Sequence, residues 1–260
     1  MIVILRAVKS SDLPAAQALI QASFDARLHP YMISTQAGAQ TYLRVFIDHA
    51  SLYPDRRFLL AETEDGALLG YAEFRLVEPF TGFLSYICVA PSARGQGVAT
   101  QLIQHYLEEV PQARTVQLDV FTHNSPALAL YRKLGFVSGE QNVWWIQDLN
   151  ASASPQPISF SHLPTALASL EQYGFCELSG NARGHPFRLG IMGERVLRCF
   201  DAQLFADTPI LASVAATFPQ LREVLAILPD TGLPPAPQAR EINRSVRMTW
   251  ALPPHAQELR

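Results

Sequence analysis

The sequence lacks the charge and the cysteine chemistry that several classes of protein need. It has 20 lysine and arginine residues against 23 aspartate and glutamate residues, which gives a formal net charge of −3. Because such a chain has no long-range positive field, we predict neither nucleic acid nor membrane as a partner. Three widely spaced cysteines, Cys88, Cys176 and Cys199, form no Cys-x-x-Cys motif or Cys/His cluster. We therefore expect no bound metal.

Long hydrophobic runs are also missing. No apolar stretch approaches the ~18 residues of a membrane-spanning helix, and the first residues lack a basic segment followed by a long apolar core. The cysteine usage is typical of a reducing compartment, so we expect a cytoplasmic protein. Hydrophobic residues nevertheless make up 48% of the 260 residues. That is enough for a packed core in one large domain or two small ones.

The first 150 residues alternate between strand and helix patterns. Expected helices cover residues 13–24, 42–47, 98–107 and 126–133, and expected strands cover residues 2–5, 58–62, 69–76, 83–89, 116–120, 136–137 and 143–146. The Asp-Gly turn at Asp65 and Gly66 joins two of these strands as an antiparallel hairpin. The pattern predicts a mixed α/β (α+β) domain over residues 1–150, in which helices flank a mostly antiparallel sheet.

The remainder of the chain repeats this outline in weaker form. Alanine, serine and proline over residues 151–157 predict a linker. Beyond it, helices are expected at 163–173 and 209–218, and strands at 175–178, 187–192, 196–200, 223–228 and 245–252. A Leu-Pro-x-Ala-x-Ala motif occurs at both 13–18 and 163–168. We interpret residues 158–260 as a smaller, degenerate copy of the first domain that has lost its ligand-binding turn.

A glycine-rich segment follows the strand expected at residues 83–89. It reads Val-Ala-Pro-Ser-Ala-Arg-Gly-Gln-Gly-Val-Ala-Thr over residues 89–100 and leads into an amphipathic helix. Glycines let a ligand approach the backbone, and the free N–H groups of a helix start attract a pyrophosphate. A dinucleotide-binding fingerprint would need a third glycine, and a Walker motif would need a lysine. The segment predicts a phosphate-binding turn, with a glycine-rich helix cap as the alternative.

A second motif supports the first. Residues 118–136 read Leu-Asp-Val-Phe-Thr-His-Asn-Ser-Pro-Ala-Leu-Ala-Leu-Tyr-Arg-Lys-Leu-Gly-Phe. Together the two motifs resemble the GNAT superfamily of acyl-CoA-dependent N-acetyltransferases. Arg94, Gly97 and Ala99 match its R-x-x-G-x-G/A element, and residues 130–136 match its L-Y-x-K-x-G-F signature. The resemblance spans about residues 3–149.

The resemblance implies a site for acetyl-CoA as co-substrate. Backbone amides of the glycine turn would hold the pyrophosphate, the backbone of the strand at 83–89 would hold the pantetheine arm, and Asn124 would form a hydrogen bond with the coenzyme. The implied coenzyme-binding residues are Ile87, Val89, Arg94, Gly95, Gln96, Gly97, Val98, Ala99, Thr100 and Asn124. The Tyr131 hydroxyl would protonate the departing thiolate. The alternatives are an N-cap role for Asn124 and a core role for Tyr131.

The general base is less well marked. An ammonium group of pKa ~10 must lose a proton before it attacks a thioester. The candidates are Asp119, five residues before Asn124, and then Glu73 on the hairpin, with Tyr86 relaying a proton through water. The alternative for Asp119 is a structural role at the strand end, as a cap or in a salt bridge.

These observations favour an enzyme that transfers acetyl from acetyl-CoA to a primary amine of a small molecule or peptide in a ternary complex. The alternative is a non-catalytic acetyl-CoA-binding sensor or assembly module, and a homodimer is left open. The resemblance implies an acceptor pocket built from the loop at residues 25–40 and the strand at 142–145. Its expected lining residues are Arg27, His29, Tyr31, Trp144 and Trp145.

Overall fold

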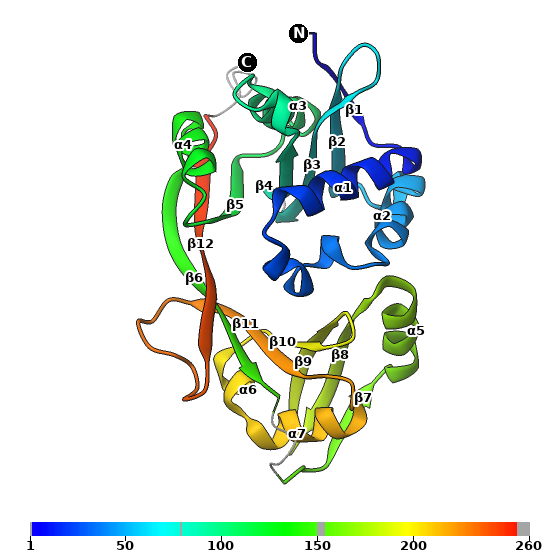
Figure 1. The fold of residues 1–260 in the computed structure, drawn as a ribbon, viewed down its shortest axis with the longest axis vertical. Helices are drawn as coiled ribbons and strands as arrows, with labels where there is room; N and C mark the ends of the chain where they lie inside the picture. The colour runs from blue at the N-terminus through cyan, green and yellow to red at the C-terminus, as the bar shows by residue number, and fades with distance from the viewer. Residues whose placement is uncertain (1, 79, 150–153, 254–260) are drawn as a thin grey trace. The chain divides into compact units, whose positions relative to one another are not determined.

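The computed structural model describes residues 2–78, 80–149 and 154–253 (Figure 1). The chain folds into two compact units. Unit 1 comprises Met1–Asp25, Tyr42–Glu140 and Val246–Arg260, and unit 2 comprises Ala26–Thr41 and Gln141–Ser245. Each unit thus contains segments from both halves of the sequence. Residues 151–153 of the expected linker lie outside the described residues, so the boundary at 151–157 stays a prediction.

The helices and strands of the first half follow the expected order. They are β1 (Ile4–Ala7), α1 (Leu13–Ser23), α2 (Ala39–Asp48), β2 (Arg56–Glu62), β3 (Leu68–Glu78), β4 (Thr81–Val89), α3 (Val98–Glu109), β5 (Thr115–Phe121), α4 (Ser125–Leu134) and β6 (Val137–Asp148). Short 3-10 helices lie at η1 (Ser10–Asp12), η2 (Ala26–Tyr31), η3 (Ile33–Thr35), η4 (Ala50–Leu52) and η5 (Pro91–Ala93).

The sheet of unit 1 has the strand order β1-β2-β3-β4-β5-β12. Neighbours from β1 to β4 pair in antiparallel fashion, and β4 pairs with β5 in parallel. Apolar side chains of α1 and α2 pack on one face with Phe58 and Tyr71. Those of α3 and α4 pack on the other face with Leu59 and Leu118. Helices therefore flank the sheet on both faces, and the expected fold class is confirmed.

Unit 2 contains a smaller α/β arrangement. Its elements are β7 (Ile158–Ser161), α5 (Leu163–Tyr173), β8 (Phe175–Ala182), β9 (His185–Met192), β10 (Val196–Cys199), α6 (Ala202–Ala206), α7 (Thr208–Thr217), β11 (Glu223–Pro229) and β12 (Arg240–Ala251). The strand order is β6-β11-β10-β9-β8-β7. Leu178, Leu189, Phe205 and Val214 contribute to its core. The short elements β7 and α6 were not expected from the sequence.

Strands β6 and β12 each contribute residues to both units. Residues 142–148 of β6 pair with β11 in unit 2, whereas Val246 and Met248 of β12 are buried in the core of unit 1. The sequence predicted two short strands, at 136–137 and 143–146, in place of β6. This prediction was wrong because Gly139 and its polar neighbours stay extended, with Gly139 next to the backbone of Arg247.

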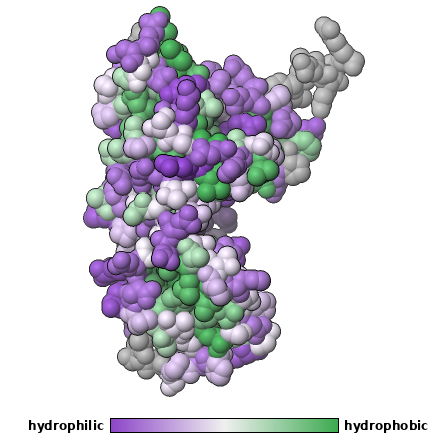
Figure 2. Space-filling model, turned by 90° about the vertical axis from the view of Figure 1, so that its right-hand side faces the viewer, coloured by the Kyte–Doolittle hydropathy of each residue, from purple (hydrophilic) through white to green (hydrophobic). Residues whose placement is uncertain are grey.

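The surface carries few large apolar groups. Figure 2 shows one face of the molecule, on which hydrophobic residues lie in small areas between hydrophilic ones. Large exposed hydrophobic side chains are scattered along the sequence from Ile2 to Leu233, as in most folded chains. Within the described residues, no helix combines the length and apolar character needed to cross a lipid bilayer.

Candidate active site

Strands β4 and β5 separate part of the way along unit 1. Their parallel pairing covers Thr81–Leu84 and Thr115–Leu118, although β4 continues to Val89 and β5 to Phe121. Ile87 and Val89 keep their partners Ala72 and Gly70 on β3. The opposite edge of β4 thus faces a gap, the β4–β5 opening. An extended ligand can add to such a free edge as an extra strand.

The glycine turn directly follows β4. Gly95 and Gly97 have φ angles of 73° and 81°, a region in which residues with a β-carbon are strained. No atom beyond the chain neighbours lies within 4 Å of a β-carbon built on Gly95, so the backbone conformation, rather than space, requires glycine there. Arg94 Nε donates to the Val89 carbonyl at 3.3 Å, and Gln96 Nε2 donates to the Ser92 carbonyl at 2.8 Å. These bonds fold the turn against the end of β4.

Helix α3 begins without a side-chain cap. Its N-cap, Gly97, supplies no side-chain hydrogen bond, and the Gln101 N–H donates to the Gly97 carbonyl at 3.0 Å. The N–H groups of Val98, Ala99 and Thr100 precede the first intrahelical bond and have no helical acceptor. These donors and the helix dipole make the start of α3 suited to an anion.

Helix α4 holds the second expected pair of residues. Tyr131 is 5% exposed, lies in the core with Leu118 and Leu128, and has its ring 5.5 Å from that of Phe136. Burial, with a smaller effect from Cys88, raises the pKa of the Tyr131 phenol above its usual value. The phenol therefore remains protonated, as a proton donor must. Asn124 caps the helix, because its Oδ1 accepts the Ala127 N–H at 3.2 Å, which leaves its Nδ2 as the donor.

Glu73 is a buried carboxyl group on β3. It is 7% exposed and lies opposite Tyr86 of β4, and the Tyr71 hydroxyl is 3.4 Å from its Oε2. Burial raises the pKa of Glu73 to about 7, against the lowering effects of Arg56, the Tyr71 hydrogen bond and Arg75. A carboxylate of this pKa is a much stronger base than an exposed one.

Asp119 has a different environment. Its carboxylate forms two bonds with Arg247 of β12, from Nε to Oδ1 at 2.6 Å and from Nη2 to Oδ2 at 2.9 Å. Both carboxylate oxygens are thus engaged by a guanidinium group in the geometry of a bidentate ion pair. This is the structural role that the sequence left as the alternative for Asp119.

Glu73 and Tyr131 lie on opposite faces of the sheet. Glu73 belongs to the α1 and α2 face, where its strand neighbour Tyr71 is packed, and Tyr131 belongs to the α3 and α4 face. On the first face, the ring of Phe24 contacts Tyr86 of β4 and Phe121 of β5, each with ring centroids 6.0 Å apart. Phe24 thus bridges the strands at the β4–β5 opening. Phe24, Phe121 and Arg247 carried no recognisable signal in the sequence because they lie on separate elements.

The expected acceptor-pocket residues separate in the structure. In unit 2, the Tyr31 hydroxyl donates to Glu223 Oε2 at 2.7 Å, and Tyr31 packs with Trp144 against Ile146 and Leu225. Trp145 lies in the other core of unit 2. The prediction that both tryptophans line one pocket was wrong, because adjacent residues of a strand point to opposite faces.

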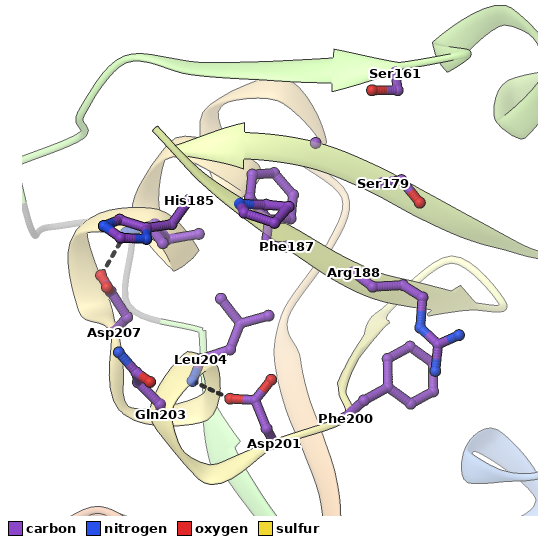
Figure 3. Close-up of a pocket in the computed structure, with 13 residues that line it drawn as sticks. Ser161, Ser179, His185, Phe187, Arg188, Phe200, Asp201, Gln203, Leu204 and Asp207 are labelled. Atoms are coloured by element: carbon purple, nitrogen blue, oxygen red, sulfur yellow. Dashed lines mark hydrogen bonds between the residues drawn. The ribbon is translucent and has the colours of Figure 1, made fainter. Parts of the chain in front are cut away.

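In the described part of unit 2, the parallel strand pair does not separate, and the helices that follow β10 have side-chain caps. Its β10 pairs with β11 in parallel along its whole length, Val196 to Cys199. The helix starts after β10 are capped by carboxylates, since Asp201 accepts the Leu204 N–H at 2.7 Å and Asp207 accepts the Ile210 N–H at 3.0 Å. Figure 3 shows Asp201 turned toward Leu204 at the edge of a pocket of about 780 Å³. A capping carboxylate occupies the place that a phosphate would need.

We also considered a cysteine nucleophile and a metal site. Burial raises the pKa of the Cys88 thiol to about 11, so the thiol is not ionised near neutral pH. Within the described ranges, no group of three or more histidine, cysteine, aspartate or glutamate side chains is placed to hold a metal ion.

Comparison with known proteins gives a family match over part of the chain and several similar proteins. The Acetyltransferase (GNAT) family matches residues 20–136. An N-alpha-acetyltransferase of Sulfurisphaera tokodaii is 34% identical over 105 residues, which cover 35% of this chain and 62% of that protein. A mycothiol acetyltransferase of Tsukamurella paurometabola is 35% identical over 88 residues, 32% of this chain and 30% of that protein. The chain thus spans less than two thirds of either curated relative.

A solved structure is similar to this chain over almost its full length. The crystal structure of a GCN5-related N-acetyltransferase from Sphaerobacter thermophilus has a TM-score of 0.60 and 19% sequence identity, and the alignment covers 95% of both chains. At this identity the similarity concerns the fold, and it includes the second half of the sequence. The chain has the fold of this N-acetyltransferase, and its residues 20–136 match the Acetyltransferase (GNAT) family.

Proposed function

We propose that this chain transfers an acetyl group from acetyl-CoA to a primary amine by direct attack in a ternary complex. The observation that carries the proposal is the β4–β5 opening, with a buried carboxyl group on one face of the sheet and a buried phenol on the other. The family match over residues 20–136 supports the same reaction. The acceptor is a small molecule or a peptide.

The glycine turn and the opening fit the coenzyme. Amides from Gly95 to Thr100, with Arg94 beside them, bind the pyrophosphate, and the backbone of Ile87 and Val89 binds the pantetheine arm. Asn124 donates through Nδ2. Acetyl-CoA supplies a thioester whose carbonyl carbon accepts the amine. The strained φ angles of Gly95 and Gly97 and the uncapped start of α3 support this assignment.

Glu73 is the general base. Its raised pKa places half of the carboxyl groups in the basic form near neutral pH, which suits removal of a proton from an ammonium group. Tyr86, directly opposite on β4, relays the proton through water. Asp119, which the sequence ranked first, is assigned the structural role, because Arg247 engages both of its oxygens.

Tyr131 is the general acid. Its protonated phenol donates to the thiolate that departs when the amine displaces it, and the proton transfer is worth about 10²–10⁴ in rate. Burial keeps the Tyr131 phenol protonated near neutral pH, so its hydroxyl is available as a donor beside the departing sulfur.

Residues 158–260 act by packing rather than by binding a second coenzyme. The fully paired β10 and the capping carboxylates Asp201 and Asp207 support this role. We place the domain boundary of the degenerate copy at residues 151–157, with β6 and β12 completing the units as described.

The experiment is a measurement of free-thiol release from acetyl-CoA with aminoglycosides, polyamines, amino acids and peptides as acceptors. Amine-dependent release that yields acetylated acceptor supports the proposal. Binding of acetyl-CoA without turnover on any amine would instead indicate the sensor or assembly module.

A further inference from the structure

Two arginines face each other beside Glu73. Arg56 of β2 and Arg75 of β3 are direct partners in the antiparallel register. The next pair on the same face, two residues along each strand, is Phe58 and Glu73. Both arginine side chains therefore project from the same face as Glu73, and both cations lower its pKa. Like charges directly opposite on neighbouring strands destabilise a sheet. Binding of an anion between the two arginines would offset this repulsion.

Each guanidinium lies over an aromatic ring. The Arg56 guanidinium carbon lies 4.4 Å from the centroid of Phe46, and that of Arg75 lies 4.9 Å from the centroid of Phe83. Stacking fixes the position of a guanidinium and leaves the N–H groups along its edge to bind other molecules. The aromatic rings thus orient the two cations without neutralising them.

Protein carboxylates do little to neutralise this pair. Asp55 approaches Arg56 only to 3.9 Å, with its own side chain 48% exposed. In the described part of the chain, no carboxylate lies within 4.0 Å of Arg75, which is exposed. By contrast, Arg247, which also lies over Phe83, is paired with Asp119. Arg75 therefore presents its positive charge to solvent without an ion pair, and Arg56, 23% exposed, has only the distant Asp55 as an ion-pair partner among the described residues.

The position of Arg75 along β3 can be compared with that of Glu73, the proposed general base. Gly70 pairs with Val89 next to the glycine turn, Glu73 pairs with Tyr86, and Arg75 pairs with Phe83. Arg75 thus lies two residues beyond Glu73, on the side away from the turn. Two residues of an extended strand span about 7 Å. An acceptor whose amine is at Glu73 would extend over Phe83 to the two arginines.

We propose that Arg56 and Arg75 form a subsite for an anionic group of the acceptor, a carboxylate or a phosphate about 7 Å from the reacting amine. The proposal rests on the function proposed above. It narrows the acceptors to amines that carry a negative charge at the far end of an extended spacer.

Calorimetry in the presence of CoA tests the subsite without turnover. The probes are 6-aminohexanoate, 5-aminopentyl phosphate and hexylamine, which share an amine and a spacer but differ in the terminal group. We expect one or both anionic probes to bind at least about tenfold more tightly than hexylamine. Arg75→Gln and Arg56→Gln should each reduce this preference, and Arg75→Lys should retain part of it. The stronger anionic probe distinguishes carboxylate from phosphate.

The matched control is Arg57→Gln. Arg57 is adjacent to Arg56, but it belongs to the opposite face, where its Nε lies 3.4 Å from Glu109 of α3. This change should leave the preference intact. Equal binding of the three probes to the wild type, no binding of any probe, or a preference that survives Arg75→Gln would overturn the subsite. Absence of acetyl transfer despite a retained preference would count against the proposed function alone.

Discussion

Arg247 of the last strand forms a bidentate ion pair with Asp119 of β5, with N–O distances of 2.6 and 2.9 Å. The two residues are 128 positions apart in sequence. The pair connects a strand that enters unit 1 late in the chain to the strand that borders the β4–β5 opening. This ion pair supports our proposal that Asp119 has a structural role and that Glu73 is the general base.

We expect Glu73→Gln and Asp119→Asn to differ sharply in activity. Glu73→Gln removes the base and should lower kcat by about 10²–10⁴. Asp119→Asn breaks a partly exposed ion pair, which contributes about 0–1 kcal/mol, and should keep kcat within about tenfold of wild type. Steady-state kinetics with a saturating amine measure both effects. The opposite ranking would make Asp119 the base.

The pH dependence follows from the pKa of Glu73. Because burial raises this pKa to about 7, the basic form appears as pH rises, and kcat/KM should increase through about pH 7. The Glu73→Gln variant should lose this inflection. A rate profile without a group near pH 7 in the wild type would contradict the assignment.

The raised pKa of Glu73 also predicts how the stability of the fold depends on pH. Between the usual pKa of 4.5 and about 7, the folded protein binds more protons at Glu73 than the unfolded chain, so stability falls as pH rises through this window. Below this pH window, Glu73 is protonated in both the folded and the unfolded chain, and its titration no longer changes the stability. At pH 8, Glu73→Gln should therefore be more stable than wild type by about 1–3 kcal/mol. Urea unfolding at pH 4 and pH 8 measures the difference, and an equal effect at both values would refute it.

Replacement of Tyr131 by phenylalanine should affect chemistry more than binding. The change removes only the hydroxyl group, so we expect kcat to fall by about 10²–10⁴ while the Kd of acetyl-CoA stays within about threefold. Calorimetry and initial rates give the two values. Wild-type turnover across the pH range would show that water or another group protonates the thiolate.

The glycine turn can be tested with a matched pair of variants. Gly97→Val places a branched side chain at a φ of 81° beside the proposed pyrophosphate site and should abolish acetyl-CoA binding. Gly66→Val introduces the same side chain at a φ of 83° in the turn between β2 and β3, with open space around it. The control should lose similar stability but bind acetyl-CoA normally. Equal affinities of the two variants would remove the pyrophosphate assignment.

Much of the fold could be predicted because local patterns and tertiary packing agree. Helix α5 spans the residues that the sequence predicted, since its apolar spacing, its early proline and Gly174 after its end all favour the same limits. The positions of Gly97, Asn124 and Tyr131 likewise followed from motifs that are local in sequence.

The sequence could not show that part of each half of the chain folds with the other half. Residues 26–41 fold with unit 2, and residues 246–253 fold with unit 1, because these choices depend on which distant surface buries the apolar side chains. The same reason explains Arg247, whose partner Asp119 lies on another element. The choice between Asp119 and Glu73 likewise required knowledge of burial, which the spacing of acidic residues does not contain.

Amine-dependent thiol release from acetyl-CoA, measured with the acetylated acceptor identified by mass, tests directly whether this chain is an acetyltransferase. We expect one thiol released per amine acetylated by the wild-type chain, and a large loss of this activity in Tyr131→Phe. Binding of acetyl-CoA with no amine-dependent release on any acceptor would contradict it.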